Sequence, residues 1–327
     1  MRAEHVSKVL ATVAQLKHSN TQTLKHLPPK NSLSIKQSNN QTIKQCKTIY
    51  FGGGTPGLCD LRPFRGLFPE DAEFTVELHP LDVTPAKLDE LKSIGVNRIS
   101  MGVQSLDDAT LRAMGRGHTA SDAARAFALI KSRFDNAGID LILGHPGDPT
   151  TRNAEALLAP LANWGLCHCS VYSLQNERGL KGVPDDETVL DGINSAARLL
   201  KSIGLERYEI SNYATPGFEC RHNLAVWRGE DYIGLGEGAY GREGHKRTRG
   251  TKGGYETSEV SPAEDLKERT LFRLRTRDGI DSSRFPEWQP TLDRFVTEGL
   301  LVKIGDPVYR LTERGTEVCD AILEELV

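Results

Sequence analysis

Groups that can bind a polar ligand follow short apolar stretches at five points of this sequence. The first is the glycine-rich turn at residues 52–55, Gly52-Gly53-Gly54-Thr55. Glycine has no Cβ, so a ligand can approach the backbone N–H groups of such a turn closely. The other four points carry carboxylate, amide, hydroxyl or imidazole groups. They belong to Glu77, His79, Gln104, Ser105, His145, Tyr172 and Gln175. This repetition indicates a binding site assembled from several loops.

An alternation of strand and helix patterns must position these groups. We expect strands at residues 48–52, 73–78, 98–103, 140–143 and 169–174, and helices at 84–94, 107–114, 120–134 and 153–161. Such alternation predicts a parallel sheet flanked by helices, in either a Rossmann-type or a barrel layout. A Rossmann sheet concentrates its binding residues in one glycine-rich turn, whereas a barrel collects residues from the ends of several strands. The sequence therefore favours a barrel.

The two ends of the chain have a different character from this alternating part, which runs over 46–245. Residues 1–17 have the apolar spacing of a helix. Residues 18–45 are rich in Asn, Gln, Ser, Thr and Lys, which is typical of a disordered or loosely packed insertion. Residues 246–263 are polar and contain glycine, so we expect a linker. Residues 264–327 combine helical periods with two short strands, which predicts a winged-helix-like α+β domain.

The composition excludes several classes of protein. A net charge of −3 over 327 residues gives no electrostatic case for binding nucleic acid or an anionic membrane. No stretch approaches the roughly 20 apolar residues that a membrane span needs, and the N-terminus is not a signal peptide. Six irregularly spaced cysteines do not form a disulfide scaffold. We therefore expect a cytoplasmic, globular protein.

A series of motifs resembles the HemN/HemW group of radical S-adenosylmethionine (radical SAM) proteins. The motifs are FGGGTP at 51–56, ELHP at 77–80, GVNRISMGVQSLDD at 95–108, GRGH at 115–118, DLILGHPG at 140–147, YEISNYA at 208–214, HNLAVW at 222–227 and GLGEGA at 234–239. The HNxxxW pattern and the compact tail are similar to the haem chaperone branch rather than the coproporphyrinogen oxidase branch. The resemblance implies an α/β fold, a partial (β/α)6 TIM-like barrel with the group's small C-terminal domain.

The resemblance also implies binding residues. The residues that match S-adenosylmethionine (SAM) contacts of the group are Gly53, Gly54, Thr55, Glu77, Gln104, Arg116 and Asp140. A guanidinium suits the SAM carboxylate, and carboxylates suit its ammonium group or ribose hydroxyls. His222 matches the histidine of the haem-associated motif, and a neutral imidazole is a common iron ligand. Glu77 and Asp140 could instead be structural ion-pair partners, and His222 a packed corner. The implied partners are haem or porphyrin and a haem-accepting protein.

The cysteines depart from the pattern of this group. Its members hold a [4Fe–4S] cluster with a CxxxCxxC loop after the first barrel strand, and Cys46 is the only cysteine before the glycine turn here. The first strand is also missing, so we expect a chain that starts too late and lacks the cluster. Cys167 and Cys169 could share one face of a strand, with Cys59 beside the glycine turn, but at the wrong edge of the barrel. We therefore expect ordinary thiols there.

Three functions remain open at this stage. The first is a HemW-like haem chaperone, truncated and cluster-deficient as written. The second is an oxygen-independent coproporphyrinogen III oxidase-like enzyme of porphyrin biosynthesis. The third is a cluster-free haem- or nucleotide-binding remnant. A zinc site is not expected, because His79, His118 and His145 stand on separate loops without ligand spacing.

Overall fold

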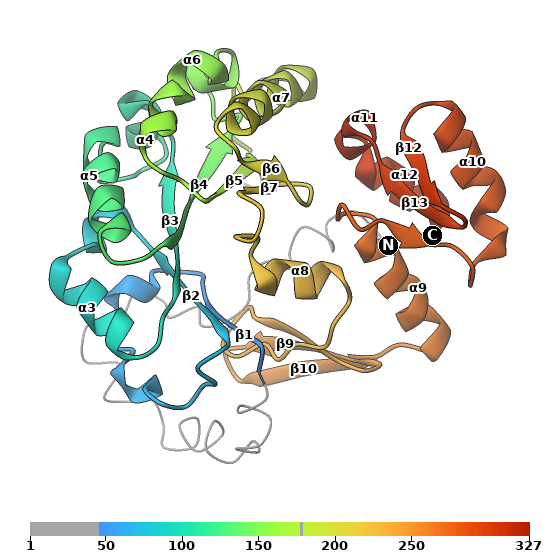
Figure 1. Ribbon diagram of the computed structural model, residues 1–327, viewed down its shortest axis with the longest axis horizontal. Coiled ribbons are helices and arrows are strands. Elements are labelled where there is room, and N and C mark those ends of the chain that lie inside the picture. The colour runs from blue at the N-terminus through green and yellow to red at the C-terminus, as the bar shows by residue number, and fades with distance from the viewer. Residues whose placement is uncertain (1–45, 177–178) are drawn as a thin grey trace.

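The computed structural model describes residues 46–176 and 179–327, and the helix expected at 1–17 and the insertion expected at 18–45 lie outside them. The described chain contains one seven-stranded sheet and two three-stranded sheets. Figure 1 shows the large sheet as a curved wall with helices on its outside, and the C-terminal helices beside it.

The large sheet is the parallel sheet that the alternating pattern predicts. Its strands are β1 (Thr48–Phe51), β2 (Glu73–Leu78), β3 (Arg98–Gln104), β4 (Asn136–Leu143), β5 (His168–Ser173), β6 (Glu206–Arg207) and β7 (Asn212–Ala214). The order is β1-β2-β3-β4-β5-β7-β6, parallel from β1 to β5 and antiparallel at β7 and β6. The expected α/β barrel-like fold is therefore confirmed.

One strand begins earlier than expected, at Asn136 rather than at residue 140. Residues 136–139 include Gly138, which has low strand propensity. In the structure a Cβ atom at Gly138 would lie 2.8 Å from the Cβ of His168 on the neighbouring strand β5. Packing between β3 and β5 therefore overrides local propensity, because only glycine leaves room for the His168 side chain.

Four of the outer helices lie close to where the sequence predicts them, and the fifth, at Asp186–Ser202, was not predicted. They are α3 (Pro85–Ser93), α4 (Asp108–Ala113), α5 (Ala120–Lys131), α6 (Ala154–Leu158) and α7 (Asp186–Ser202). Helix α3 begins after Thr84, whose side chain accepts a hydrogen bond from the N–H of Lys87. Helix α5 begins with a capping box in which Thr119 and Asp122 each accept the other's backbone N–H. Short 3₁₀ turns connect these elements: η3 (Pro56–Leu58), η4 (Arg62–Phe64), η5 (Pro80–Asp82), η6 (Pro149–Thr151) and η7 (Ala159–Asn163).

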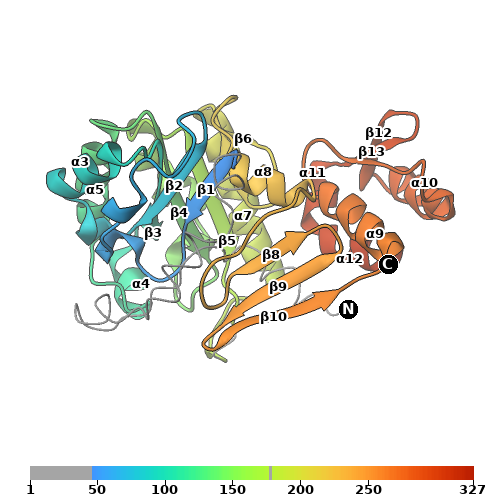
Figure 2. The same ribbon diagram turned by 90° about the horizontal axis from the view of Figure 1, so that it is seen from below.

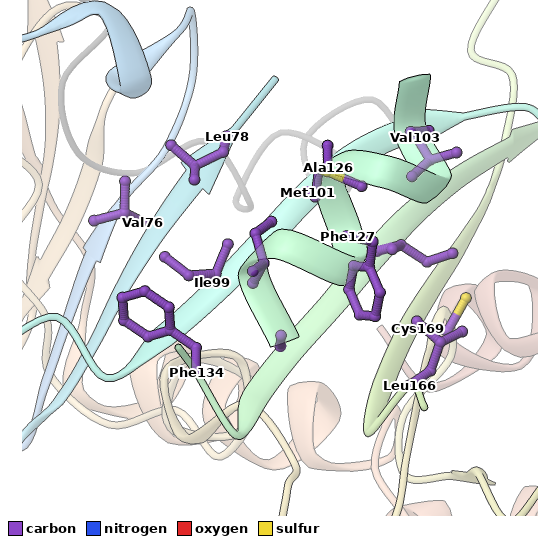
Figure 3. Close-up of a cluster of buried hydrophobic side chains, with 14 of the residues drawn as sticks. Val76, Leu78, Ile99, Met101, Val103, Ala126, Phe127, Phe134, Leu166 and Cys169 are labelled. Atoms are coloured by element: carbon purple, nitrogen blue, oxygen red, sulfur yellow. The ribbon is translucent and has the colours of Figure 1, made fainter. Parts of the chain in front are cut away.

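The two faces of the sheet differ in chemistry. Side chains alternate along each strand, so every second residue points outward. The outward residues are apolar and buried against the helices, and Figure 3 shows Val76, Ile99 and Met101 of the strands and Phe127 of α5 in this apolar cluster. The inward residues of the same strands are polar, and they include Glu77 and Arg98. Sheets covered on both faces are usually apolar on both, so the polar inner face marks this side as the candidate site.

Two elements lie on the inner side of the barrel. Helix α8 (Arg221–Trp227) lies beside β1, and the sheet formed by β8 (Tyr240–Glu243), β9 (Lys246–Thr251) and β10 (Gly254–Glu259) lies next to it, as Figure 2 shows. The expectation of a linker at 246–263 is wrong for this segment, because β9 and β10 form an antiparallel hairpin. Its strands are polar because β10 is exposed along its whole length and Arg247 of β9 is ion-paired with Asp265.

The C-terminal segment has its own apolar core and contains the expected helices and hairpin. Its elements are α9 (Pro262–Arg273), β11 (Ile280–Asp281), η8 (Pro286–Trp288), α10 (Gln289–Thr297), β12 (Leu301–Gly305), β13 (Val308–Leu311), α11 (Glu313–Glu317) and α12 (Cys319–Leu326). The core includes Leu274, Leu292 and Tyr309. The domain boundaries themselves stay predictions. Within the ranges that the structure covers, no helix is long and apolar enough to cross a bilayer.

Candidate functional site

The glycine turn follows β1 and packs onto the carboxyl group of Glu77. Gly53 and Gly54 have φ angles of 74° and 60°, in the region that favours glycine. The N–H of Gly53 donates to Glu77 Oε2 at 3.0 Å. A Cβ atom on Gly52 would lie 2.8 Å from Glu77 Oε1, so glycine is required there too. Gly54 is exposed and Thr55 is half-buried, which leaves these two residues of the turn open to a ligand.

Two acidic side chains, Glu77 and Asp140, lie on the inner wall. Glu77 accepts a hydrogen bond from Tyr50 Oη at 2.8 Å, and Asp140 accepts one from Ser100 Oγ at 3.2 Å. Burial raises the pKa of Glu77, and the nearby Asp140 raises it further; burial also raises the pKa of Asp140. Neither forms a salt bridge with any residue in the described ranges. The two acids are therefore suited to a cationic or hydroxyl-bearing ligand.

Gln104 ends β3 in an unusual conformation. Its φ angle is 69°, whereas the other residues with positive φ in the described ranges are glycines. A Cβ atom on Gly102 would lie only 2.6 Å from Gln104 Nε2, so the amide folds back over Gly102. Gly102 is the register partner of Asp140 on β4. The structure therefore brings Gln104 to the same wall as the two acids.

Arg116 lies on the loop after α4 and is half-buried. Its guanidinium makes no hydrogen bond or salt bridge within the part of the chain that the structure describes. Burial lowers its pKa, although an arginine remains charged at neutral pH. The charge of Arg116 contributes to lowering the pKa of the His79 and His118 imidazoles. Arg116 is thus an unpaired cation suited to a carboxylate.

His222 lies on α8, on the other side of Tyr50. Its Nδ1 is 3.2 Å from Thr48 Oγ1, and its ring centroid is 5.1 Å from that of Tyr50. Burial, with a contribution from Arg98, lowers its pKa to about 4, so the imidazole is neutral at physiological pH. The ring of Tyr50 lies against the His222 imidazole at an interplanar angle of 32°, and its hydroxyl donates to Glu77. It therefore connects the predicted haem ligand to the predicted SAM site.

The start of α8 is fixed by an acid from the sheet. The carboxylate of Glu73 accepts the backbone N–H groups of Arg221 and His222, both at 3.0 Å. These donors would otherwise be unsatisfied at the helix N-terminus. Glu73 thereby sets the position of His222 relative to β1.

Sequence reasoning missed several polar residues of the inner wall. Arg98 is 1% exposed, and its Nε and Nη1 have no hydrogen-bond partner; the same holds for Thr75 Oγ1 and His168 Nδ1. Thr75 and Arg98 are register partners on β2 and β3. The signal that could have found Arg98 is a charged residue inside a predicted strand, on the same face as the polar residues of that strand rather than on its apolar face. The structure also brings His79 and His118 together, with His79 Nε2 and His118 Nδ1 3.2 Å apart.

The cysteines considered as alternative cluster ligands are buried thiols. Cys167 Sγ lies 3.1 Å from the carbonyl of Ala137, and Cys169 is fully buried. Burial raises the pKa of both thiols and of Cys59, which disfavours the thiolate form that binds metal. Over the described ranges, no group of three His, Cys, Asp or Glu side chains is placed to hold a metal ion. The described residues therefore do not fit a [4Fe–4S] cluster.

Comparisons with known proteins identify the family of the chain. The Radical SAM superfamily pattern matches residues 23–154. The heme chaperone HemW of Bacillus subtilis is 31% identical over 86% of this chain and 86% of its own length. HemW of Synechocystis is 34% identical over 75% of this chain and 68% of its own length. A mouse protein, radical S-adenosyl methionine domain-containing protein 1, mitochondrial, is 32% identical over 80% of this chain and 63% of its own length.

A solved structure shares the fold. Coproporphyrinogen III oxidase (HemN) from Escherichia coli superposes with a TM-score of 0.72, over 86% of this chain and 77% of that one, at 19% identity. That identity supports a common fold only. The sequence relatives place the protein more finely, since several HemW proteins match most of its length at about 30% identity. The chain therefore belongs to the HemN/HemW group of the radical SAM superfamily, among the relatives of HemW.

Proposed function

We propose that this protein is a HemW-type haem chaperone that binds haem through His222 and SAM at the carboxyl edge of the barrel. The relatives named heme chaperone support the first part. One observation carries the proposal: Tyr50 contacts both the neutral imidazole of His222 and the acidic wall formed by Glu77 and Asp140. Delivery to a haem-accepting protein and a cytoplasmic location stay predictions.

The chemistry of the wall suits SAM. Arg116 has its donors free for the carboxylate of the methionine moiety, and a guanidinium binds a carboxylate through two parallel hydrogen bonds. Glu77 and Asp140 form no salt bridge within the described residues, although the charge of Arg98 lowers the pKa of each, and they suit the ammonium group or the ribose hydroxyls. Membership of the superfamily implies SAM together with an iron–sulfur cluster. These residues suit SAM but not the cluster, so we propose SAM binding and no radical reaction.

The surroundings of His222 suit an iron ligand. Its pKa of about 4 keeps the imidazole neutral, as a ligand must be. Metal-binding histidines commonly donate their second N–H to a neighbouring oxygen, which fixes the ring. Thr48 Oγ1, 3.2 Å from Nδ1, is in the position to accept that proton. This arrangement leaves the Nε2 lone pair for iron.

A haem titration tests the first half of the proposal. We expect the wild-type protein to bind haem with a shift of the Soret band, and His222→Ala to weaken binding by more than about tenfold, equivalent to about 1.4 kcal/mol. The matched control is His245→Ala, because the His245 side chain is 52% exposed and lies on the β8–β9 turn. Equal affinity of all three proteins would remove His222 as the ligand.

Equilibrium dialysis with labelled SAM tests the second half. We expect Arg116→Ala and Glu77→Gln each to weaken SAM binding, while Arg112→Ala, at an exposed arginine of α4, leaves it unchanged. The two halves are independent measurements. A protein that binds haem but not SAM would keep the haem site and reject the SAM site.

A further inference from the structure

The backbone at Gln104 is held in a strained turn. The N–H of Ser105 donates to the carbonyl of Val103 at 2.9 Å, with Gln104 between them at a φ of 69°. A γ-turn with a positive central φ is rare and costs conformational energy. Such a turn persists only when surrounding groups fix it. It is also what folds the Gln104 amide over Gly102 and onto the inner wall.

A buried histidine contacts the same turn. The carbonyl of Val103 lies 3.1 Å from Nε2 of His118, which is 2% exposed. His118 belongs to the GRGH sequence after α4, so a loop distant in sequence reaches the end of β3. The carbonyl thus receives two hydrogen bonds, one inside the turn and one from His118. The second of these ties the peptide between Val103 and Gln104 to the loop that carries Arg116.

His79 fixes the protonation of His118. The N–H of Leu81 donates to His79 Nδ1 at 3.2 Å, so the proton of the neutral His79 ring is on Nε2. His79 Nε2 then donates to Nδ1 of His118, 3.2 Å away. The proton of His118 is therefore on its own Nε2, where it points at Val103. Burial lowers the pKa of both rings, to about 4 for His79, and the charge of Arg116 adds to this.

We propose that His118, held by His79, is a positioning residue that locks the Val103–Ser105 turn and so aims the Gln104 amide at bound SAM. This inference rests on the proposed SAM site. Neither histidine contacts the ligand in this scheme. Their part is to keep a strained turn formed before the ligand arrives, so that SAM binding does not have to order it.

A pair of substitutions at His118 separates positioning from general stability. The amide nitrogen of a glutamine can take the place of Nε2 and donate to Val103, whereas leucine fills similar space without a donor. We expect His118→Leu to weaken SAM binding about tenfold, in line with the loss of one buried hydrogen bond. We expect His118→Gln to stay within about threefold of wild type, and both variants to bind haem normally, because His222 lies on α8.

The result that overturns the inference is SAM binding by His118→Leu that equals that of the wild type. Weakening by both variants to the same degree also overturns it, because the retained donor would then make no difference. If the wild-type protein itself does not bind SAM, the proposed SAM site fails, and the role of His118 toward SAM fails with it. Wild-type binding with unaffected variants rejects the positioning role alone.

Histidine tautomers give a readout that needs no ligand. In long-range ¹H–¹⁵N correlation spectra of the ¹⁵N-histidine-labelled protein, we expect both His79 and His118 to be neutral at pH 7 and protonated on Nε2. The signals can be assigned by difference against His79→Gln and His118→Gln. A His118 protonated on Nδ1 could not donate to Val103, and that spectrum would reject the relay whatever the SAM affinity.

Discussion

Two regions of this protein bury arginine side chains and treat them in opposite ways. Between β8, β9 and α9, Arg242 Nη2 lies 2.6 Å from Glu268, and Arg247 Nη2 lies 2.5 Å from Asp265. In the barrel, Arg98 is as deeply buried as Arg242 but forms no salt bridge within the described residues. Its Nε and Nη1 have no hydrogen-bond partner, and in the first region the same holds for Arg242 Nη1 and Arg247 Nε. The carboxylate of Glu73, which stabilises the charge of Arg98, is already bonded to the start of α8.

This difference distinguishes a structural ion-pair network, the cluster around Asp265, from a candidate binding site, the inner wall of the barrel. Charges that are paired and hydrogen-bonded hold elements together, and the cluster around Asp265 joins the β8–β10 sheet to the C-terminal segment. A buried polar group without a partner costs roughly 1–3 kcal/mol. The inner wall collects such groups and two acids of raised pKa, and sites with these properties are often functional. The barrel wall therefore contains a buried arginine without a salt bridge among the described residues, whereas the arginines of the cluster are each bound to a carboxylate.

The largest expected effect comes from breaking the paired cluster. Asp265 is 6% exposed and binds both Arg247, at 2.5 Å, and Arg269, at 2.7 Å. Removing one member of a buried ion network leaves the others uncompensated and typically costs about 3–5 kcal/mol. We predict a loss of this size in the free energy of unfolding of Asp265→Ala, measured by urea denaturation.

An exposed ion pair on α10 provides the control for this experiment. Glu298→Gln removes an acid that lies 3.2 Å from Arg294, with both side chains over 40% exposed. Exposed pairs contribute about 0–1 kcal/mol, so this variant should remain close to wild type. A similarly small loss for Asp265→Ala would mean that the cluster does not stabilise the fold, and the contrast between the two regions would be lost.

The second prediction concerns acid sensitivity of the barrel side. The pKa of His222 is about 4 in the fold and about 6.5 in an unfolded chain, so only the unfolded form gains a proton between these values. Its contribution to stability is complete above pH 6.5 and is lost as the pH falls toward 4. We predict that His222→Gln loses less stability than wild type between pH 7 and pH 4.5, by about 1–3 kcal/mol.

Urea denaturation at the two pH values measures this difference. The raised pKa values of Glu77 and Asp140 act in the opposite direction, because acids that are protonated more easily in the fold gain stability as the pH falls. That contribution is shared by both proteins and cancels in the comparison. Parallel pH profiles for His222→Gln and wild type would contradict the buried, neutral state of this imidazole.

Much of the candidate site could be predicted from sequence because of the parallel sheet. The carboxyl ends of parallel strands meet at one edge, so Glu77 and Gln104 could be brought together from their positions after strand patterns. The role of Tyr50 could not, because it depends on α8, which is more than 150 residues further along the chain. The contact between His79 and His118 likewise joins two loops that no local pattern relates.

The polar hairpin β9–β10 shows a different limit. Local composition at residues 246–259 resembles a linker, because Lys, Arg, Thr and Gly carry no apolar alternation. The strands form because Arg247 is bound by acids of α9 and because β9 pairs with strands on both sides. Such stabilisation comes from residues distant in sequence, so periodicity within the segment does not report it.

A smaller effect is expected at the link between the two predicted binding sites. Tyr50→Phe removes the hydrogen bond to Glu77, 2.8 Å in length, and keeps the ring against His222. A net loss of about 1 kcal/mol in the free energy of unfolding is expected for one such bond. A double-mutant cycle with Glu77→Gln measures the coupling directly. Additive effects of the two substitutions would show that Tyr50 does not connect the two sites energetically.

The smallest expected effect is the sharpest test of the comparison. Arg98→Met and Arg242→Met remove equally buried arginines, each 1% exposed, and replace them by an apolar side chain of similar length. Arg242→Met removes the 2.6 Å partner of Glu268 Oε1 and leaves Glu268 with Arg247 alone, 2.8 Å from Oε2, so we predict a loss of about 3 kcal/mol. Arg98→Met removes donors that are already unsatisfied, and Glu73 keeps its bonds to α8, so we predict a change below about 1 kcal/mol.

Arg98→Met also has an electrostatic consequence that a purely structural arginine would lack. The charge of Arg98 lowers the pKa of both His222 and His168, so its removal should raise the pKa of each ring. NMR titration of the histidines measures this shift, and urea denaturation of both methionine variants measures the loss of stability. If Arg98→Met destabilises the protein as much as Arg242→Met does, Arg98 has a strong partner after all. The inner wall would then be a second structural network that stabilises the fold, and its unpaired groups would no longer argue for a ligand.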